Sequence, residues 1–306
     1  MKVSIIGAGN VGSSAAWVVC DKAIADEVVL VDITEGIPQG KALDIQEAMP
    51  LSRSNVKIKG TNNYSEIKDS DVVVVTAGVP RKPGMSRDDL LETNSNIIRS
   101  IAGEIKKNAP YSVVIVVTNP LDIMSYLMLK ETGFDRKKVL GMAGVLDSTR
   151  FRTFIADMLE TGVNDIEAMV LGGHGDSMVP LRKHTTVKGK PITDFLDDKD
   201  VEALIDRTRN GGAEIVKHLK TGSAFYAPGA SIAEMIDAIL KQDDRILPCS
   251  VMLQGEYGYK DIFLGVPCRL DSKGLKDIIE LDLSDEEKNQ LDDSAAAVKK
   301  NVDKLR

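Results

Sequence analysis

Aromatic side chains and cysteine are scarce in this sequence. Phe, Trp and Tyr make up 4% of the 306 residues, whereas 43% of the residues are hydrophobic, so aliphatic side chains must fill most of the core. The three cysteines, Cys20, Cys249 and Cys268, are widely spaced and form no Cys-x-x-Cys pair. This usage argues against a disulfide framework and against a zinc site. A reducing cytoplasm is the compartment that it favours.

Long hydrophobic runs and an excess of positive charge are also missing. No apolar run approaches the roughly 18 residues of a membrane-spanning helix, so we expect no membrane partner. The 39 Lys and Arg residues against 46 Asp and Glu residues leave a net charge of −7. This balance disfavours nucleic-acid binding, which usually leaves a basic footprint. It does not exclude small anionic substrates, because these need only a few local positive charges.

The first half of the chain alternates short Val- and Ile-rich runs with longer segments. Continuous β-branched runs are typical of strands buried on both faces, and strands that alternate with helices predict βαβ units and a parallel sheet. The expected strands are residues 2–6, 28–31, 72–76 and 113–117. The expected helices are residues 11–23, 40–49, 90–108 and 124–132.

This pattern changes near residue 142. The second half favours helices over residues 149–158 and 201–219, and a Gly211-Gly212 pair interrupts the second of these for no reason that the sequence reveals. Three strand-like runs separated by Gly-containing turns predict an antiparallel meander. They are residues 249–254, 261–266 and 276–283. Ser284 and Glu287 form a capping box that begins a last helix.

These patterns predict two domains of an α/β protein. The length fits about two domains at roughly 150 residues each. We expect a parallel-sheet domain over residues 1–142 and a mixed α+β domain with antiparallel strands over residues 143–306.

A glycine-rich turn follows the first expected strand. Gly7, Gly9 and Gly12 have the spacing Gly-x-Gly-x-x-Gly and open the first expected helix. The first glycine permits a tight turn, the second lets the backbone approach a pyrophosphate, and the third lets the helix pack against the strand. Amides at the helix N-terminus, including those of Asn10 and Val11, favour a phosphate group. The alternative is a cluster of turn glycines that binds nothing.

Asp32 ends the second expected strand, about 20 residues beyond the last of these glycines, a spacing typical of ribose recognition. A carboxylate there accepts hydrogen bonds from the adenosine ribose and repels a 2′-phosphate, which favours NAD over NADP. Its alternative role is to cap the next segment. Thr76, Ala77 and Gly78 follow another strand, at the sheet edge where ligands of open α/β sheets bind. We therefore predict a Rossmann-type NAD-binding domain.

Candidate substrate-binding residues begin in a loop rich in Pro and Gly. Residues 78–87 include Arg81 and Arg87, and Asn119 follows a later strand at the same edge of the sheet. A solvated basic loop is the alternative interpretation of this segment.

The second half supplies another polar group. Asp147 and Arg150 are three residues apart and share one helix face. His174 stands among glycines in the segment GGHGDS, where it is open to close approach. His184 and His218 have no such setting, and we interpret them as structural.

Together these segments resemble the lactate/malate dehydrogenase family, in its lactate-dehydrogenase-like malate dehydrogenase branch. The resemblance covers essentially the whole chain and is most specific in IIGAGNVG, VTAGVPRKPGMSR, TNPLD, LDSTRFR and GGHGDSMVP. It implies hydride transfer between NAD and a small dicarboxylate, (S)-malate or oxaloacetate, as in the tricarboxylic acid cycle. It also implies a homotetramer or a homodimer.

The resemblance implies a role for each polar residue of the two groups. His174 acts as the general acid/base, which suits a side chain that changes charge near neutrality. Asp147 fixes the tautomer of His174, and Arg150 holds the substrate's C1 carboxylate through a bidentate fork. Arg87 polarises the substrate carbonyl. The loop that begins at Gly78 closes over the bound ligands.

Arg81 is the residue that we expect to select the substrate. In this family a positive charge at this loop position suits a second carboxylate, whereas a neutral Gln suits a methyl group. Burying Arg81 against a methyl group would leave its charge unpaired. Asn119 is expected to bond the substrate region or the cofactor, and Asn94 to line the pocket.

Three alternatives remain open. The first is an L-lactate dehydrogenase or a dual-specificity enzyme on the same scaffold. The second is an NAD-dependent glycosidase, which should carry metal ligands; Cys249 and Cys268 lack that setting, and we expect no metal. The third is a non-catalytic NAD-binding protein, which would have no need for His174, Asp147 and Arg150 together.

Overall fold

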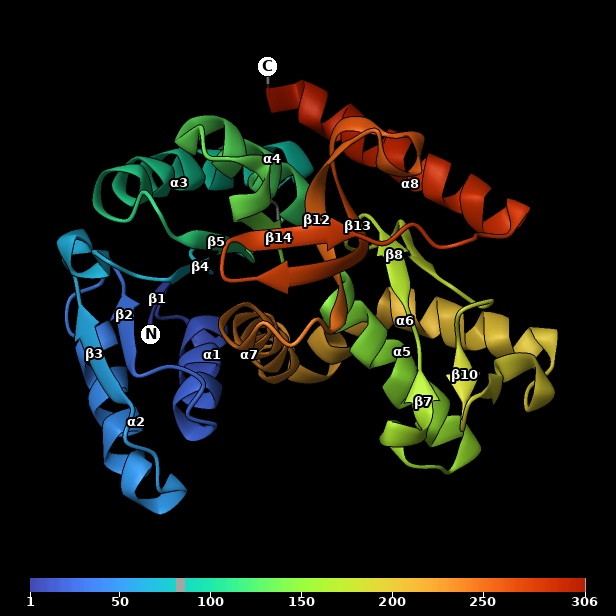
Figure 1. Ribbon diagram of the computed structural model, residues 1–306, viewed down its shortest axis with the longest axis horizontal. Coiled ribbons are helices and arrows are strands. Elements are labelled where there is room, and N and C mark those ends of the chain that lie inside the picture. Colours follow the sequence, from blue (N-terminus) through green and yellow to red (C-terminus); the bar gives the residue numbers. More distant parts are fainter. Residues whose placement is uncertain (81–85, 306) are drawn as a thin grey trace. The chain divides into compact units, whose positions relative to one another are not determined.

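The computed structural model describes residues 1–80 and 86–305, which divide into two compact units (Figure 1). Unit 1 comprises Met1–Met142, Ala224–Arg245 and Arg269–Asp277. Unit 2 comprises Ala143–Ser223, Ile246–Cys268 and Ile278–Arg306. The first segment of unit 1 ends at Met142, but two later segments of the chain also belong to this unit. Within the described ranges, no helix is long and apolar enough to cross a membrane.

Unit 1 is built on a parallel sheet with the strand order β3-β2-β1-β4-β5-β6. The strands are β1 (Lys2–Ile6), β2 (Glu27–Val31), β3 (Lys57–Thr61), β4 (Val72–Val75), β5 (Val113–Val116) and β6 (Val139–Gly141). Side chains of β4 and β5 are buried throughout, as their β-branched runs predict. The order reverses between β1 and β4, and doubly wound sheets bind ligands at the carboxyl edge of such a switch point.

Helices accompany this sheet in the same unit (Figure 1). They are α1 (Asn10–Asp21), α2 (Ile37–Ser52), α3 (Arg87–Asn108), α4 (Leu121–Thr132) and α7 (Tyr226–Lys241), with the short 3-10 turns Tyr64–Ile67 and Arg136–Lys138. The helix α7 was not expected from the sequence, because Pro228 and Gly229 lie in its first turn and are typical of turns and loops. It packs closely on α1, where a Cβ added at Gly229 would lie 2.7 Å from the Cβ of Ser14.

Unit 2 combines helices with mainly antiparallel strands. Its helices are α5 (Gly144–Leu159), α6 (Asp198–Leu219) and α8 (Asp285–Val302), with 3-10 turns at Val163–Asp165, Ile192–Asp194, Glu256–Gly258 and Asp303–Leu305. Its strands are β7 (Ile166–Glu167), β8 (Val170–Gly172), β9 (Met178–Pro180), β10 (Thr186–Val187), β11 (Lys190–Pro191), β12 (Ile246–Gln254) and most of β13 (Lys260–Asp271). β8 is antiparallel to both β13 and β9, and β10 is antiparallel to β7 and β11.

Two expectations about the second half need correction. The helix α6 runs unbroken through Gly211 and Gly212, so the expected interruption is wrong. The last expected strand is shorter and begins earlier, as β14 (Gly274–Ile278), which pairs with β13. The capping box of α8 is confirmed: Ser284 Oγ accepts from the Glu287 N–H at 3.2 Å, and a Glu287 carboxylate oxygen accepts from the Ser284 N–H at 2.9 Å.

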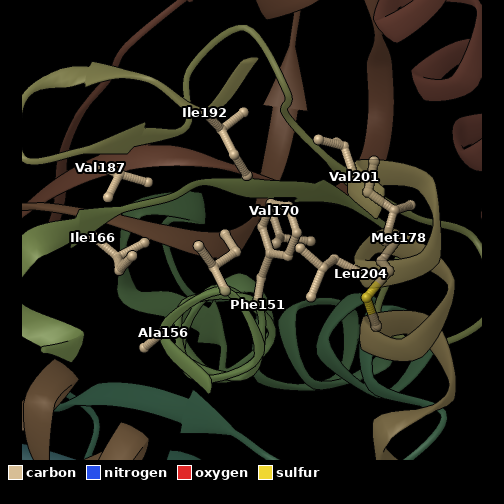
Figure 2. Close-up of a cluster of buried hydrophobic side chains, with 11 residues drawn as sticks. Phe151, Ala156, Ile166, Val170, Met178, Val187, Ile192, Val201 and Leu204 are labelled. Atoms are coloured by element: carbon tan, nitrogen blue, oxygen red, sulfur yellow. The ribbon is translucent and has the colours of Figure 1, made fainter. Parts of the chain in front are cut away.

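A buried apolar cluster in unit 2 fixes α5 against β8 and α6 (Figure 2). Phe151 of α5 is fully buried, and Val170 of β8 and Leu204 of α6 lie in the same cluster. Burial of each such side chain contributes roughly 1.5–3 kcal/mol. The cluster matters for function because α5 and the end of β8 carry the polar residues that the sequence singles out in this half.

Candidate functional site

The glycine loop between β1 and α1 leaves no room for side chains at two of its three glycines. A Cβ on Gly7 would lie 2.6 Å from Thr76 Oγ1, and φ at Gly7 is +110°. A Cβ on Gly12 would lie 1.9 Å from the Gly7 carbonyl oxygen, which is impossible without moving the backbone. Gly9 is different, because a Cβ there would meet no atom of residues 1–80 and 86–305 within 4 Å. The backbone at Gly9 is therefore open to a ligand that approaches the first turn of α1.

Side chains from neighbouring segments hold this loop in place. One carboxylate oxygen of Asp32 accepts from the Ala8 N–H at 2.7 Å, and the other accepts from the Thr34 N–H at 2.9 Å. Thr76 Oγ1 donates to the Gly7 carbonyl at 3.0 Å. Lys41 Nζ donates to the Ala8 carbonyl at 2.8 Å. Lys41 was not expected from the sequence, because no spacing rule connects it to a residue 33 positions earlier.

Asn94 connects two loops at the carboxyl edge of the sheet. Its side chain is 1% exposed, and its Nδ2 donates to the Asn119 carbonyl at 2.7 Å and to the Val79 carbonyl at 3.2 Å. Its Oδ1 accepts from the Val79 N–H at 2.9 Å. Beside it, a Cβ on Gly78 would lie 2.6 Å from Thr118 Cγ2. The amide of Asn94 thus fixes the backbone after β4 to the backbone after β5.

The side chains of both arginines of the 78–87 loop lie outside what the structure describes. Arg81 lies outside the described residues. Arg87 is the first residue of α3, and its side chain lies outside what is described. Ser86 and Asp89 form a capping box at this helix end, and the hydrogen bond from the Ser86 N–H lowers the pKa of Asp89.

In unit 2, one buried carboxylate holds two polar partners. Asp147 Oδ2 lies 2.9 Å from His174 Nδ1, and Asp147 Oδ1 lies 3.2 Å from Arg150 Nη1. The Asp147 side chain is 2% exposed, whereas His174 and Arg150 are each 14% exposed. The cluster therefore has a buried anion at its base and a histidine and an arginine that both reach solvent.

Local contacts place these residues together. Asp147 and Arg150 lie one helical turn apart on α5, and His174 lies two residues beyond the end of β8. Between them on α5, Ser148 Oγ accepts from the Val170 N–H at 2.9 Å, which ties the start of β8 to α5. Gly173 N–H donates to Ser294 Oγ at 2.8 Å and holds the backbone directly before His174.

The glycine pair of α6 lies against Arg150. A Cβ on Gly211 would lie 3.3 Å from Arg150 Cδ and 3.5 Å from Phe154 Cε2, and a Cβ on Gly212 would lie 3.7 Å from Arg150 Nη2. Arg150 Nε is buried and makes no hydrogen bond within residues 1–80 and 86–305. Two glycines in a helix interior cost about 1 kcal/mol each relative to alanine. Gly211 gives the Arg150 side chain its space, whereas a Cβ on Gly212 would make only an ordinary van der Waals contact with it.

The other histidines lie elsewhere. His184 Nε2 is 3.0 Å from the Asp282 carbonyl oxygen, and His218 is an exposed residue in the last turn of α6. In the part of the chain that the structure describes, no group of three or more His, Cys, Asp or Glu side chains could hold a metal ion.

Comparison with known proteins identifies the family of this chain. Residues 1–141 match the lactate/malate dehydrogenase NAD binding domain, and residues 144–306 match the lactate/malate dehydrogenase alpha/beta C-terminal domain. The chain belongs to the lactate/malate dehydrogenase family. A malate dehydrogenase from Chloroherpeton thalassium is 50% identical over 305 residues, which cover 100% of this chain and 98% of the relative.

Solved structures of this family have the same fold. A malate dehydrogenase from Salinibacter ruber has a TM-score of 0.96 and 48% identity, with 100% of this chain and 97% of that chain covered. A lactate dehydrogenase from Cryptosporidium parvum, in complex with lactic acid and NAD, has a TM-score of 0.96 and 42% identity, with 99% of this chain and 97% of that chain covered. The family resemblance and the α/β fold class expected from the sequence are confirmed. Because both names occur at a TM-score of 0.96, the fold alone does not separate malate from lactate.

Membership of the lactate/malate dehydrogenase family makes the protein an NAD-dependent oxidoreductase. The residues present fit this cofactor. The open backbone at Gly9 and the first turn of α1, whose N-cap residue Gly9 makes no side-chain cap, suit a pyrophosphate. Half-buried Asp32 stands at the end of β2, where a carboxylate can accept from ribose hydroxyls.

Proposed function

We propose that the protein is an NAD-dependent malate dehydrogenase that interconverts (S)-malate and oxaloacetate. The observation that carries this proposal is the 2.9 Å contact between His174 Nδ1 and the buried carboxylate of Asp147, which also holds Arg150. Asp147 thus contacts both the side chain that would transfer the proton, His174, and the side chain that would bind a carboxylate, Arg150. Relatives named malate dehydrogenase at about 50% identity supply the substrate class.

The proton chemistry would centre on His174. Its Nδ1 faces Asp147, so the opposite ring nitrogen, Nε2, would be the atom that exchanges a proton with the substrate. In oxaloacetate reduction Nε2 would give a proton to the carbonyl oxygen, and in malate oxidation it would take the proton from the hydroxyl. Asp147 would keep the imidazole in one tautomer and stabilise the imidazolium, as carboxylates do in comparable pairs.

The cofactor and its binding groups occupy unit 1 in this proposal. NAD, when bound, supplies the acceptor and donor of hydride. Gly7, Gly9, Asn10, Val11 and Gly12 would receive the pyrophosphate. Asp32 would bind the ribose. The rest of the cofactor would lie along the backbone of Thr76, Ala77 and Gly78. It would also lie along the loop at Asn119, which Asn94 holds in place.

Substrate binding would depend on arginines. Arg150 would hold the C1 carboxylate with its planar fork, since arginine suits bidentate recognition of carboxylates. Arg87 would stabilise charge on the carbonyl oxygen. Arg81 would pair with the second carboxylate, and Asn119 would bond the substrate or the nicotinamide region.

Further properties belong to the same proposal. Residues 1–142 would form the NAD-binding domain, which also contributes Arg81, Arg87 and Asn119 to substrate binding, and residues 143–306 would form the substrate-binding and catalytic domain. The chain would assemble as a homodimer or homotetramer. The three cysteines are buried thiols, which supports a reducing, cytoplasmic location. L-lactate dehydrogenase is the second candidate function, because a lactate dehydrogenase bound to lactic acid shares the fold at a TM-score of 0.96.

The test is the rate of NADH oxidation with oxaloacetate and with pyruvate, measured side by side. We expect a higher kcat/KM for oxaloacetate, and faster turnover of pyruvate would reject the malate assignment. The variant Arg81→Gln should lose far more activity with oxaloacetate than with pyruvate. Equal losses with both substrates would remove Arg81 from substrate selection.

A further inference from the structure

Lys41 lies beside the glycine loop although it belongs to α2. Its Nζ donates to the Ala8 carbonyl at 2.8 Å and lies 3.4 Å from Ser13 Oγ in the first turn of α1. Its half-buried side chain lines a groove of about 520 Å³ together with Asn10, Ser13 and Trp17. These two contacts hold the ammonium group at the N-terminal end of α1, and the long side chain does not extend into solvent.

The contact with Ala8 fixes the direction of a peptide group. Asp32 accepts from the Ala8 N–H, and Lys41 donates to the Ala8 carbonyl, so the peptide groups on both sides of Ala8 are held by charged side chains. In a trans peptide the carbonyl and the following N–H point in opposite directions. Holding the Ala8 carbonyl therefore also sets the direction of the Gly9 N–H, at the glycine whose surroundings are open.

The position of the charge has a second effect. The N-terminus of a helix carries a partial positive charge that favours phosphate groups. At α1 the Lys41 ammonium adds a full positive charge to that end, in a protein whose net charge is −7. Both effects act on the phosphate part of a dinucleotide and not on its base.

We infer that Lys41 is a cofactor-positioning residue, which orients the Ala8–Gly9 peptide and supplies positive charge for the pyrophosphate of NAD. The inference rests on the NAD-binding role of the glycine loop in the proposed function. The plain alternative is that Lys41 only tethers α2 to the loop. In that case its loss would lower stability and leave the affinity for phosphate-containing ligands unchanged.

The experiment compares Lys41→Met, Lys41→Arg and a control, Lys107→Met, by direct binding of NADH, ADP-ribose and adenosine. Lys107 is an exposed lysine in the last turn of α3, so its substitution removes one charge without touching the loop. We expect Lys41→Met to raise the Kd of NADH and of ADP-ribose about tenfold, the scale of one lost hydrogen bond to a charged group. The Kd of adenosine, which has no phosphate, should stay within about twofold of that of the unmodified protein, well below one such bond.

The remaining outcomes are equally definite. Lys41→Arg should restore most of the NADH affinity, and Lys107→Met should leave the Kd of NADH and of ADP-ribose unchanged. An unchanged NADH Kd in Lys41→Met, or an equal loss for adenosine and ADP-ribose, would overturn the inference. If Lys41→Met does not fold, Lys41→Gln carries the same test. These binding constants need no substrate, so failure of the malate assignment would show separately, as absent NADH oxidation with oxaloacetate.

Discussion

The glycine loop of unit 1 and the His174 cluster of unit 2 reach function by different means. In the loop, free space around the backbone is decisive, because a Cβ at Gly12 would lie 1.9 Å from a carbonyl oxygen whereas Gly9 is open. In the cluster, specific side-chain atoms are decisive, because one carboxylate holds a histidine and an arginine at 2.9 and 3.2 Å. Adding atoms should therefore damage the first region, and removing atoms should damage the second.

The largest expected effect comes from removing the ring nitrogen that transfers the proton. His174→Asn should lower kcat for oxaloacetate reduction about 10³-fold, within the range for loss of a general acid/base. The Kd of NADH should stay unchanged, since the glycine loop does not depend on this side chain. Stopped-flow kinetics and fluorescence titration measure the two quantities. Full turnover in this variant, with NADH binding intact, would contradict the role of His174.

The second effect comes from adding one methyl group to the loop. Gly9→Ala should fold normally, because in the part of the chain that the structure describes the new Cβ meets no atom within 4 Å. Its NADH Kd should nevertheless rise about 10- to 100-fold, since crowding of about 1–3 kcal/mol would fall on the ligand alone. Gly103→Ala, on α3 with equally open surroundings, is the matched control and should bind NADH normally. Normal binding by Gly9→Ala would mean that the pyrophosphate does not approach this backbone.

A smaller effect is expected at the glycine pair beside Arg150, where free space at a glycine and the position of a functional side chain both matter. Gly211→Ala should raise KM for oxaloacetate about fivefold with little change in kcat, the result of about 1 kcal/mol of crowding against Arg150. Gly103→Ala should raise the free energy of unfolding by about 1 kcal/mol through helix propensity, without any change in KM. Steady-state kinetics and urea unfolding of both variants check this. If KM is equal in the two variants, Gly211 has no influence on Arg150.

The smallest effect concerns the free energy of unfolding at high pH. Each unit has a buried thiol, so the pH dependence of this free energy can be compared between the units. Burial raises the pKa of Cys20 in unit 1 and of Cys249 in unit 2 from 9.0 to about 12. Between pH 9 and 12 the folded thiols stay protonated while the unfolded ones ionise. Each thiol should therefore lower the free energy of unfolding by about 1 kcal/mol per pH unit above pH 9, and have no such effect below it.

Urea unfolding at pH 8 and pH 10 measures this loss. Cys20→Ala and Cys249→Ala should each lose less stability between the two pH values than the unmodified protein. Equal reductions within one transition would show that the units unfold together. An unchanged pH dependence in both variants would contradict the protonated state of the buried thiols.

Strands buried on both faces were predictable from the sequence, whereas the edge strand β3 and the helix α7 were not. The strands β1, β4 and β5 are continuous apolar runs, which only a sheet covered on both faces accommodates. The strand β3 alternates lysines with half-buried residues and ends a sheet, so it has no such run. The helix α7 was missed for another reason, since Pro228 and Gly229 in its first turn are typical of turns and loops.

In the candidate site, too, some features were predictable from the sequence and others were not. The spacing of Gly7, Gly9 and Gly12 and the helical turn between Asp147 and Arg150 are local patterns that can be read directly. The contact of His174 with Asp147 spans 27 positions and was expected only through family resemblance. Lys41 spans a comparable distance to Ala8 and was missed, because long-range contacts depend on packing that no local pattern encodes.

The division of the chain has a consequence for its synthesis. Unit 1 needs α7 from Ala224–Arg245, and it needs the β13–β14 turn, where Gly274 fits so closely that a Cβ would lie 2.1 Å from the Lys137 carbonyl oxygen. Domains generally fold as units while the ribosome delivers the chain from its N-terminus. The cofactor-binding half is begun first, yet it cannot finish packing until Asp277 has emerged. A chain that ended at residue 142 would contain the parallel sheet of unit 1 but would lack α7 and the β13–β14 turn, which pack in the same unit.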